Sequence, residues 1–262
     1  MFVAVWRRAA RAAWAVSAVT LLLSLTAHSA FADEQRVKRF GVALYAMPTG
    51  MQLDDVNEQI KVLNITSALF GLAPIDEIHW GAQFGVEGRY FINRHWVAVA
   101  GFGRIKKESK LDLIPQVGSS ITVSARVLTV PRNLGVDYYF NPYTRGDFSL
   151  RPFVGGGLMD LVETQVKIGG QFVSPDTTFG NFQRPQGEGQ GFYAESGVHF
   201  MFPSRYSILL NVMYRHAKAS RLRNVDNGEF VYNEDGTPME IDVSGFGLRL
   251  AAQISLFGKP PD

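Results

Sequence analysis

Short runs with a two-residue hydrophobic period recur along most of the chain. The clearest lies in residues 240–257, where Phe246 and Leu248 fall on one face and Gly247 and Arg249 on the other. Side chains alternate between the two faces of a β-strand, so such a run predicts a strand with one apolar and one polar face. The other runs occupy residues 39–47, 78–91, 95–108, 119–140, 148–168, 190–202 and 205–220.

The connections between these eight runs alternate between short and long. The short ones are residues 92–95, 141–147 and 203–205, and the long ones are 48–77, 109–118, 169–189 and 221–239. This alternation predicts an all-β fold, an eight-stranded antiparallel up-and-down barrel with one trimmed and one elaborated rim. Within 119–140 the alternation changes parity between Arg126 and Asn133, which predicts a bulge at Pro131.

The first long connection carries a different period. In residues 53–70, Asp55 is the expected N-cap, and Glu58 follows it at the spacing of a capping box. The apolar residues that share a helical face are Val56, Ile60 and Leu63. A short helix is therefore predicted in this loop. It would pack on the barrel rim, cover the lumen or contact an outside partner, and the pattern does not choose among these roles.

A soluble barrel is apolar inside, whereas a membrane barrel is apolar outside. The aromatic residues favour the second, because they gather beside each short turn, as aromatic belts do at a membrane interface. They are Tyr90, Phe91, Trp96, Tyr138, Tyr139, Phe140, Tyr143, Phe200, Phe202, Tyr206 and Phe257.

The N-terminus agrees with export. Arg7, Arg8 and Arg11 precede an apolar stretch that is too short to span a bilayer, and Ala30-Phe31-Ala32 fits a signal peptidase site. We expect a signal peptide in residues 1–32 and one barrel domain in residues 33–262. Without the leader the chain is nearly neutral, which gives no basis for binding nucleic acid. There is no cysteine, hence no disulfide or thiolate site.

From residue 39 to 257 the chain resembles the bacterial eight-stranded outer-membrane β-barrels, the class that includes the transmembrane domain of outer membrane protein A. The most specific piece is the last strand, "IDVSGFGLRLAAQISLF", although "GKPPD" follows Phe257 where the family commonly ends on the aromatic residue. The resemblance implies a place in the bacterial outer membrane, contact with its lipid and lipopolysaccharide, and insertion by the outer-membrane assembly machinery. It implies a structural or surface-interaction role in the envelope, with a small passive pore for hydrophilic solutes as the alternative. We expect a monomer, although the sequence itself does not determine the oligomeric state.

Charged residues on the polar faces would fill the lumen of such a barrel. They are Glu87, Arg89, Arg126, Asp137, Glu163, Glu195, Arg215 and Arg249. With four acidic and four basic members, the set is able to pair almost completely, as buried charges must. Two readings follow: a neutralised structural plug, or a narrow pore gated by ion pairs. The run Gly155-Gly156-Gly157 would leave room for large lumen neighbours or bend the strand.

A third function, lipid A hydrolysis, rests on "YRHAKAS". It is similar to the active strand of the outer-membrane lipid A 3-O-deacylases, where a His and a Ser are separated by one residue. Here His216 and Ser220 lie four positions apart, about 13 Å along a strand, whereas a base must lie within about 3 Å of the proton that it takes. We therefore predict no catalytic site and no enzyme activity. The five His residues show no metal-ligand spacing, so we predict no metal site, and we expect no cofactor.

Basic residues collect where two of the predicted strands leave the apolar band at the elaborated rim. We expect them to contact lipopolysaccharide phosphates. They are Arg104, Lys106, Lys107, Lys110, His216, Lys218, Arg221 and Arg223.

Overall fold

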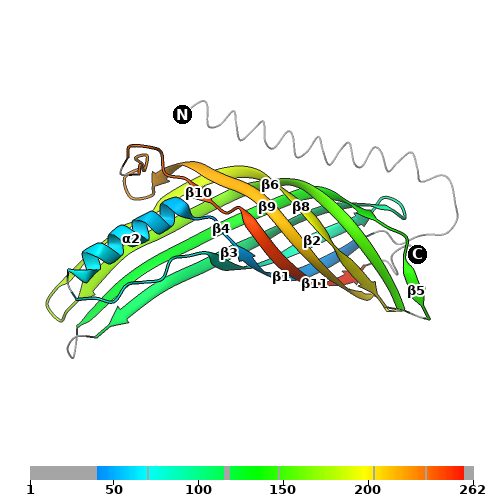
Figure 1. Ribbon diagram of the computed structural model, residues 1–262, viewed down its shortest axis with the longest axis horizontal. Helices are drawn as coiled ribbons and strands as arrows, with labels where there is room; N and C mark the ends of the chain where they lie inside the picture. Colours follow the sequence, from blue (N-terminus) through cyan, green and yellow to red (C-terminus); the bar gives the residue numbers. More distant parts are fainter. Residues whose placement is uncertain are drawn as a thin grey trace. The chain divides into compact units, whose positions relative to one another are not determined.

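The computed structural model describes residues 40–256, except 70, 115–118, 147, 203 and 234. The predicted signal peptide in residues 1–32 and the aromatic residue Phe257 lie outside the described residues. Figure 1 shows long, strongly tilted strands with a helix beside them.

Eight long strands close into a ring, which confirms the predicted eight-stranded antiparallel barrel. Each strand pairs antiparallel with the next in the order β1–β2–β3–β4–β6–β8–β9–β11, and β11 returns to β1. Their bounds are β1 Phe40–Gly50, β2 Trp80–Phe91, β3 Trp96–Leu113, β4 Ser120–Tyr139, β6 Phe148–Val173, β8 Pro185–Met201, β9 Tyr206–Asn224 and β11 Gly245–Ser255.

The remaining elements lie at the two ends of the ring. The short-turn end holds the connections after β2, β4 and β8 and the small strand β5 (Tyr143–Arg145). The long-loop end holds helix α2 (Asp54–Ala68), β7 (Thr178–Gln183) and β10 (Ile241–Asp242). No helix in the described part of the chain is long and apolar enough to cross a membrane.

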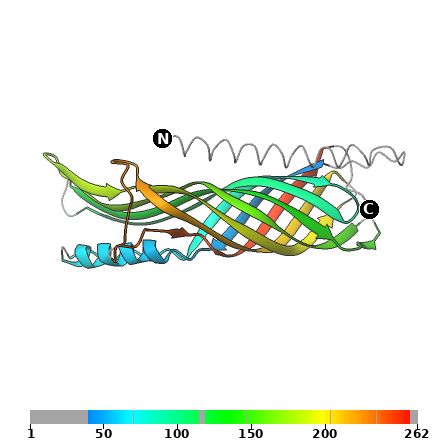
Figure 2. The same ribbon diagram turned by 90° about the horizontal axis from the view of Figure 1, so that it is seen from above.

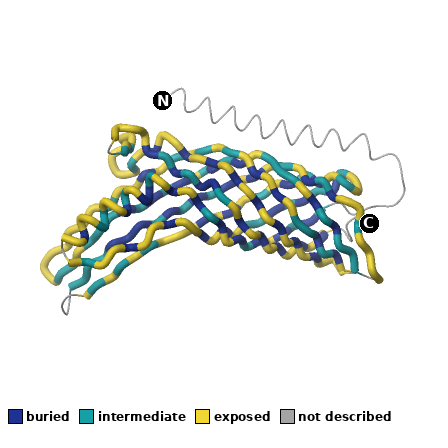
Figure 3. Tube along the Cα trace, viewed as in Figure 1, coloured by how far each residue is buried: buried dark blue, intermediate teal, exposed yellow. Residues whose placement is uncertain are grey.

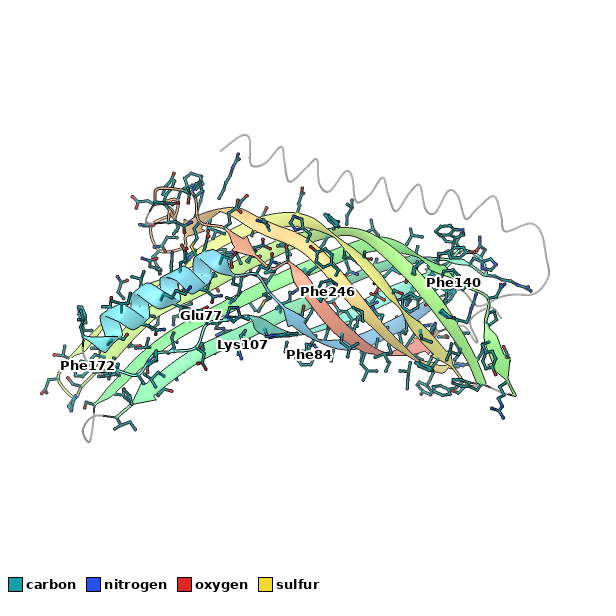
Figure 4. The ribbon with its side chains drawn as sticks, in the orientation of Figure 1. Glu77, Phe84, Lys107, Phe140, Phe172 and Phe246 are labelled. Carbon is teal, nitrogen blue, oxygen red and sulfur yellow. The ribbon has the colours of Figure 1, made fainter. Side chains whose placement is uncertain are left out.

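Burial alternates along the ring strands (Figure 3), and the outward face is apolar between the short-turn end and the level where α2 begins. Phe84 and Phe246 are more than three-fifths exposed there, and Phe140 lies at the short-turn end (Figure 4). Two of the aromatic residues expected in the outer belt do not lie on the outer face. Phe91 and Tyr139 are buried inside the ring, with ring centroids 5.9 Å apart.

Three ring strands continue beyond the closed ring and, with one additional strand, form what we call the sheet extension. It comprises the distal parts of β3, β4 and β6 together with β7, which pairs with the last residues of β6. Helix α2 lies along the inner face of this extension, so the sheet is on one side and the helix on the other (Figures 1 and 2). The helix predicted in residues 53–70 is thus confirmed.

The distribution of polarity reverses between the ring and the extension. Inside the ring the buried residues include many polar and charged side chains, whereas the outward residues are apolar. In the extension Val127 and Ile168 point inward with α2 residues Val56 and Ile60 in one hydrophobic core. The ring is therefore built like a membrane protein and the extension like a soluble one, with an apolar interior.

Two asparagines of α2 fix the segment that returns to β2. Asn57 and Ile78 exchange two hydrogen bonds, of 2.8 and 3.2 Å, between the side-chain amide and the backbone. Asn64 and Ile75 exchange an equivalent pair, both of 2.9 Å. The two amides lie seven residues apart and therefore on one face of the helix. Helix and return segment form one unit.

The expected capping box at the start of α2 is wrong. The helix begins at Asp54, and Leu53 at the N-cap position makes no side-chain capping bond. The Asp55 carboxylate instead accepts hydrogen bonds from the Asn233 side chain (2.9 Å) and the Glu240 backbone N–H (2.7 Å). It joins the helix to the connection between β9 and β10, a partner about 180 residues away that local spacing does not reveal.

A β-bulge lies at the level of Pro131, where a bulge was predicted, but the extra residue belongs to the neighbouring strand. Pro131 pairs with Leu161 and Val130 with Glu163, so Val162 of β6 has no counterpart in β4. The parity of β4 therefore stays constant, and that of β6 changes at Val162. This reverses the expected orientation of residues on both strands, as described below.

Ile60 tests whether α2 is held by the core that it shares with the extension. Ile60→Ala should cost about 2–5 kcal/mol at this buried site, and we expect limited proteolysis to cut residues 53–79 faster. The barrel, assayed by its mobility shift on heating in gels, should persist. Ile65→Ala, at a position on the same helix that is 69% exposed, serves as the control; equal cleavage of both variants would contradict the packing.

Candidate functional site

Five charged residues meet in the middle of the ring, which we call the charge cluster: Glu87, Arg89, Asp137, Glu195 and Arg249. Glu87 bridges the two arginines, with its oxygens 2.5 Å from Arg89 Nη1 and 2.6 Å from Arg249 Nη1. Arg89 also pairs with Asp137, and Arg249 also pairs with Glu195. Four strands contribute these side chains, so the cluster ties the ring together across its interior.

Neighbouring small and neutral residues complete the cluster. Asn211 donates to Glu195 (2.5 Å) and accepts from Arg249 Nε (2.8 Å). Gly155 stands beside Asp137, and a Cβ at this position would overlap the carboxylate. The glycine run predicted to leave room for large lumen neighbours does so at Gly155.

An aromatic layer closes the interior toward the short-turn end. The Tyr139 hydroxyl accepts a hydrogen bond from Arg89 (3.1 Å) and lies 3.3 Å from His199 Nδ1. His199 Nε2 lies 2.8 Å from Ser207 Oγ. The Arg151 guanidinium lies 5.2 Å from the centre of the Tyr139 ring and donates to the Arg94 carbonyl. These contacts extend the polar network from the charge cluster to the rim.

Arg215 lies on the side of the charge cluster toward the long-loop end, where its hydrogen-bond partners are neutral groups. It donates to the Val243 carbonyl (2.5 Å), to Gln83 Oε1 (2.8 Å) and to the Gly50 carbonyl (3.3 Å). Gln83 in turn donates to the Tyr45 hydroxyl (3.0 Å). Arg215 thus joins β1, β2 and the link between β10 and β11 where the ring gives way to the apolar core under α2.

Six of the eight residues predicted for the lumen lie in the interior: the five of the charge cluster and Arg215. Arg126 and Glu163 do not, and their assignment to the lumen was wrong. Both side chains face outward. In β4 no residue is bulged, so Arg126, an odd number of positions from the inward Asp137, lies on the opposite face. In β6 the bulged residue Val162 shifts Glu163 to the outer face.

Sequence reasoning missed several interior residues. Arg151 and His199 are completely buried, and so is Tyr139, which looked like a belt aromatic. Their strand parity was available in the sequence: His199 shares a face with Glu195, and Arg151 is two residues from Phe153 on the inward face. Which residues pair across the ring follows only from the tilt and register of the strands.

The interior is dry. Arg89 and Asp137 are 0% exposed and Glu87 is 2% exposed. A ring of eight strands is just wide enough for side chains to fill it, and charged groups there require partners. The arrangement is that of a packed plug in which every charged side chain of the cluster has at least one ionic partner.

All eight basic residues expected at the elaborated rim are exposed, but they form two groups. Arg104, Lys106, Lys107 and Lys110 lie on β3, whereas His216, Lys218, Arg221 and Arg223 lie on β9. Strands β11, β1 and β2 separate them.

Carboxylates already partner some of these cations. Lys110 lies 2.6 Å from Asp112, and Lys218 lies 3.0 Å from Asp242. Beyond the apolar band, the hydrogen bond with Asp242 raises the pKa of Lys218 above its ordinary value, and the hydrogen bond with Lys110 lowers the pKa of Asp112. Arg104 forms no ion pair with another described residue and is the better candidate for an external anion.

His216 and Ser220 both point outward from β9, four residues apart. Among the hydrogen bonds of the described residues, none joins these two side chains. His216 Nδ1 instead lies 3.2 Å from Ser244 Oγ. Ser244 is buried, and its Oγ accepts the Ala217 backbone N–H. This hydroxyl secures the start of β11 to β9. In the described part of the chain no cluster of three or more His, Asp or Glu side chains is arranged to hold a metal ion.

The sequence matches the family described as outer membrane protein beta-barrel domain over residues 17–252. No curated protein matches the chain. Among solved structures, the chain is similar to the outer membrane protein OprG from Pseudomonas aeruginosa, with 13% identity over 83% of this chain and 96% of that one and a TM-score of 0.42. It is also similar to Neisserial surface protein A, with 12% identity over 83% and 97% of the two chains and a TM-score of 0.38.

Arg249 tests the charge cluster. Arg249→Met keeps an unbranched side chain but leaves Glu87 and Glu195 with one partner fewer in a dry interior, and breaking a buried pair in this way costs about 3–5 kcal/mol. We expect the midpoint of urea unfolding in lipid vesicles to fall accordingly. The control is Arg132→Met on the exposed outer face, which should stay within about 0.5 kcal/mol of the parent. Equal midpoints for both variants would show that the cluster contributes nothing.

Proposed function

The chain belongs to the outer membrane protein β-barrel domain family and is located in the bacterial outer membrane, and on that premise we propose that it is a closed barrel with a structural and surface-interaction role. The ring anchors the protein in the bilayer, and the sheet extension with α2 is the part that it presents outside the cell. The observation that carries the proposal is the buried charge cluster, in which every charged side chain has an ionic partner.

The cluster favours an anchor over a pore. A conducting lumen needs a continuous water-filled path, whereas here two arginines are each held by two carboxylates and lie against a layer of buried aromatic rings. Opening such a path would require several desolvated ion pairs to separate together, which is costly. The small passive pore is therefore the second candidate.

The extension supports a role at the surface. Its apolar core holds α2 against the sheet, so the outer part is a folded unit with its own interior. A barrel that served only as an anchor would have no use for such a unit. We assign no catalytic role to the chain, because His216 is directed to the buried hydroxyl of Ser244 and not to Ser220. The last ring strand, β11, remains our prediction for the segment that the assembly machinery reads.

Conductance separates the two candidates. The refolded protein in a planar bilayer should give no discrete current steps at protein amounts at which an open porin in the same bilayer gives many. Heat-dependent gel mobility of the same preparation would show that the barrel is folded. Stepwise currents from the folded protein would overturn the closed barrel in favour of the passive pore.

We also propose that the exposed cations at the long-loop end contact lipopolysaccharide phosphates. Arg104 and Lys106 face outward on β3 just beyond the exposed aromatic Phe102. Arg132 and Arg126, the latter turned outward by the strand register, lie opposite this part of β3 on β4. The outer leaflet supplies the phosphates at this level.

Replacing two of these cations measures the contact. The pair Arg104→Gln and Lys106→Gln should weaken binding of lipopolysaccharide to the detergent-solubilised barrel by about 1 kcal/mol per cation removed. Arg145→Gln with Arg205→Gln removes the same charge at the short-turn end and should leave the affinity unchanged. If the two double variants bind alike, the assignment fails.

A further inference from the structure

Strand β7 has one paired edge and one open edge. It pairs with β6 from Thr178↔Val173 to Gln183↔Ile168, and no strand of the described chain pairs with its other side. Ser174 and Thr177 exchange both backbone hydrogen bonds at the hairpin turn (2.8 and 3.3 Å). Because bonded and non-bonded pairs alternate in an antiparallel ladder, Phe179 and Asn181 bond to β6. The backbone groups of Thr178, Gly180 and Phe182 therefore point to the open edge.

The two edges of the sheet extension differ in composition. The distal part of β3, at the opposite edge, carries Lys107, Glu108, Lys110 and Asp112, and charged residues of this kind protect an edge from further pairing. The β7 sequence, "TFGNFQ", has no charge, and Phe179 is 75% exposed. The β7 edge therefore has no such protection against the addition of another strand.

A groove of 780 Å³ runs beside the open edge. Asn181 and Gln183 of β7 line one side, α2 lines another along most of its length, and Tyr232 and Asp235 of the β9–β10 connection complete it. Strand β9 ends at Asn224, level with Pro185 at the start of β8. The place beside β7 that a longer β9 would occupy is thus free of any described strand. Figure 2 shows α2 and the extended sheet on the two sides of this part of the protein.

The charge of the groove selects among possible occupants. Among the described residues that line it, Asp55, Glu58 and Asp235 are acidic and Lys61 is the one cation. Lys61 is itself 3.7 Å from Glu77. The lining is therefore acidic, and the amide side chains of Asn181 and Gln183 add hydrogen-bonding groups. An occupant with basic side chains complements these carboxylates.

We propose that the groove binds an extended, basic segment of a partner protein, which adds to β7 as a further antiparallel or parallel strand. Backbone bonds to Thr178, Gly180 and Phe182 would supply affinity, and Glu58 with its acidic neighbours would select cationic side chains, as in other cases of strand addition. Six residues of β7 span roughly 20 Å, so the segment is about six residues long. The inference rests on the surface-interaction role proposed above and names its partner class.

The experiment uses the full barrel in detergent and a labelled eight-residue peptide of alternating Lys and Val, followed by fluorescence anisotropy. Two control peptides have Glu in place of Lys, or N-methyl groups on alternate backbone amides. We expect saturable binding of the Lys-Val peptide alone. If the N-methylated peptide binds with equal affinity, charge alone accounts for the binding and strand addition is wrong. If the Lys-Val peptide does not bind, the proposal is also overturned.

Two matched variants locate the site. Phe182→Pro and Phe182→Ala both lose the ring, but only the proline also removes the N–H that points to the open edge. We expect Phe182→Pro to bind about five- to tenfold more weakly than Phe182→Ala, the worth of one backbone hydrogen bond. Glu58→Gln should also weaken binding, whereas Glu163→Gln, on the outer face of β6, should not. Equal affinities within either pair overturn the assignment.

A second copy of the chain is the rival occupant. The β7 strand of a second copy has no basic side chain to pair with the carboxylates of the groove, so we expect the protein to remain a monomer in sedimentation experiments. A dimer that Phe182→Pro dissociates and Phe182→Ala does not would assign the edge to self-association and overturn the proposal. Conductance is measured on the same preparations. If the protein gives no current steps and binds no peptide, the proposed peptide-binding groove is wrong and the closed barrel stands. If the protein gives current steps, the closed barrel is wrong.

Discussion

Lipid offers no hydrogen-bond partner to a peptide group, so a chain that crosses a bilayer with strands has to close its sheet into a ring. Every other feature of the interior follows from that closure. With eight strands the enclosed space is only wide enough for side chains, and strand alternation turns every second residue inward. The lipid-facing positions must be apolar, so the polar residues occupy the interior and have to satisfy one another. Glu87, shared between Arg89 and Arg249, is the centre of that arrangement.

Beyond the bilayer the constraint no longer applies, and the fold changes accordingly. Water is able to satisfy an open strand edge, so β3, β4 and β6 continue together beyond the last pairs with β2 and β8, and β7 is added on one side. The interior turns apolar, since it now excludes water instead of filling a lipid-enclosed lumen. Helix α2 replaces the missing wall, held by Val56 and Ile60 in the core and by Asn57 and Asn64 at the return segment.

Much of this was predictable from the sequence because strand alternation is a local signal. The eight runs, the short and long connections and the helix near residues 53–70 all follow from spacing along the chain. The charge pairing did not, since Arg249 and Glu87 meet only when the ring closes. Arg126 and Glu163 were misplaced for one reason: a single bulged residue changes the parity of a strand, and the proline that signals it marks the neighbouring strand. Asp55 was read as a cap because its true partners lie far away in sequence.

The bulge at Val162 has a consequence for how such a molecule diversifies. Before it, β6 presents apolar residues such as Leu158 to the outside; after it, Val166 and Ile168 turn inward and Glu163 turns outward. The extra residue thus changes which positions of β6 face inward: odd-numbered residues in the ring and even-numbered residues in the sheet extension. Insertions or deletions of two residues beyond Val162 preserve both phases, whereas a change of one residue would turn Val166 and Ile168 outward and expose the apolar core under α2.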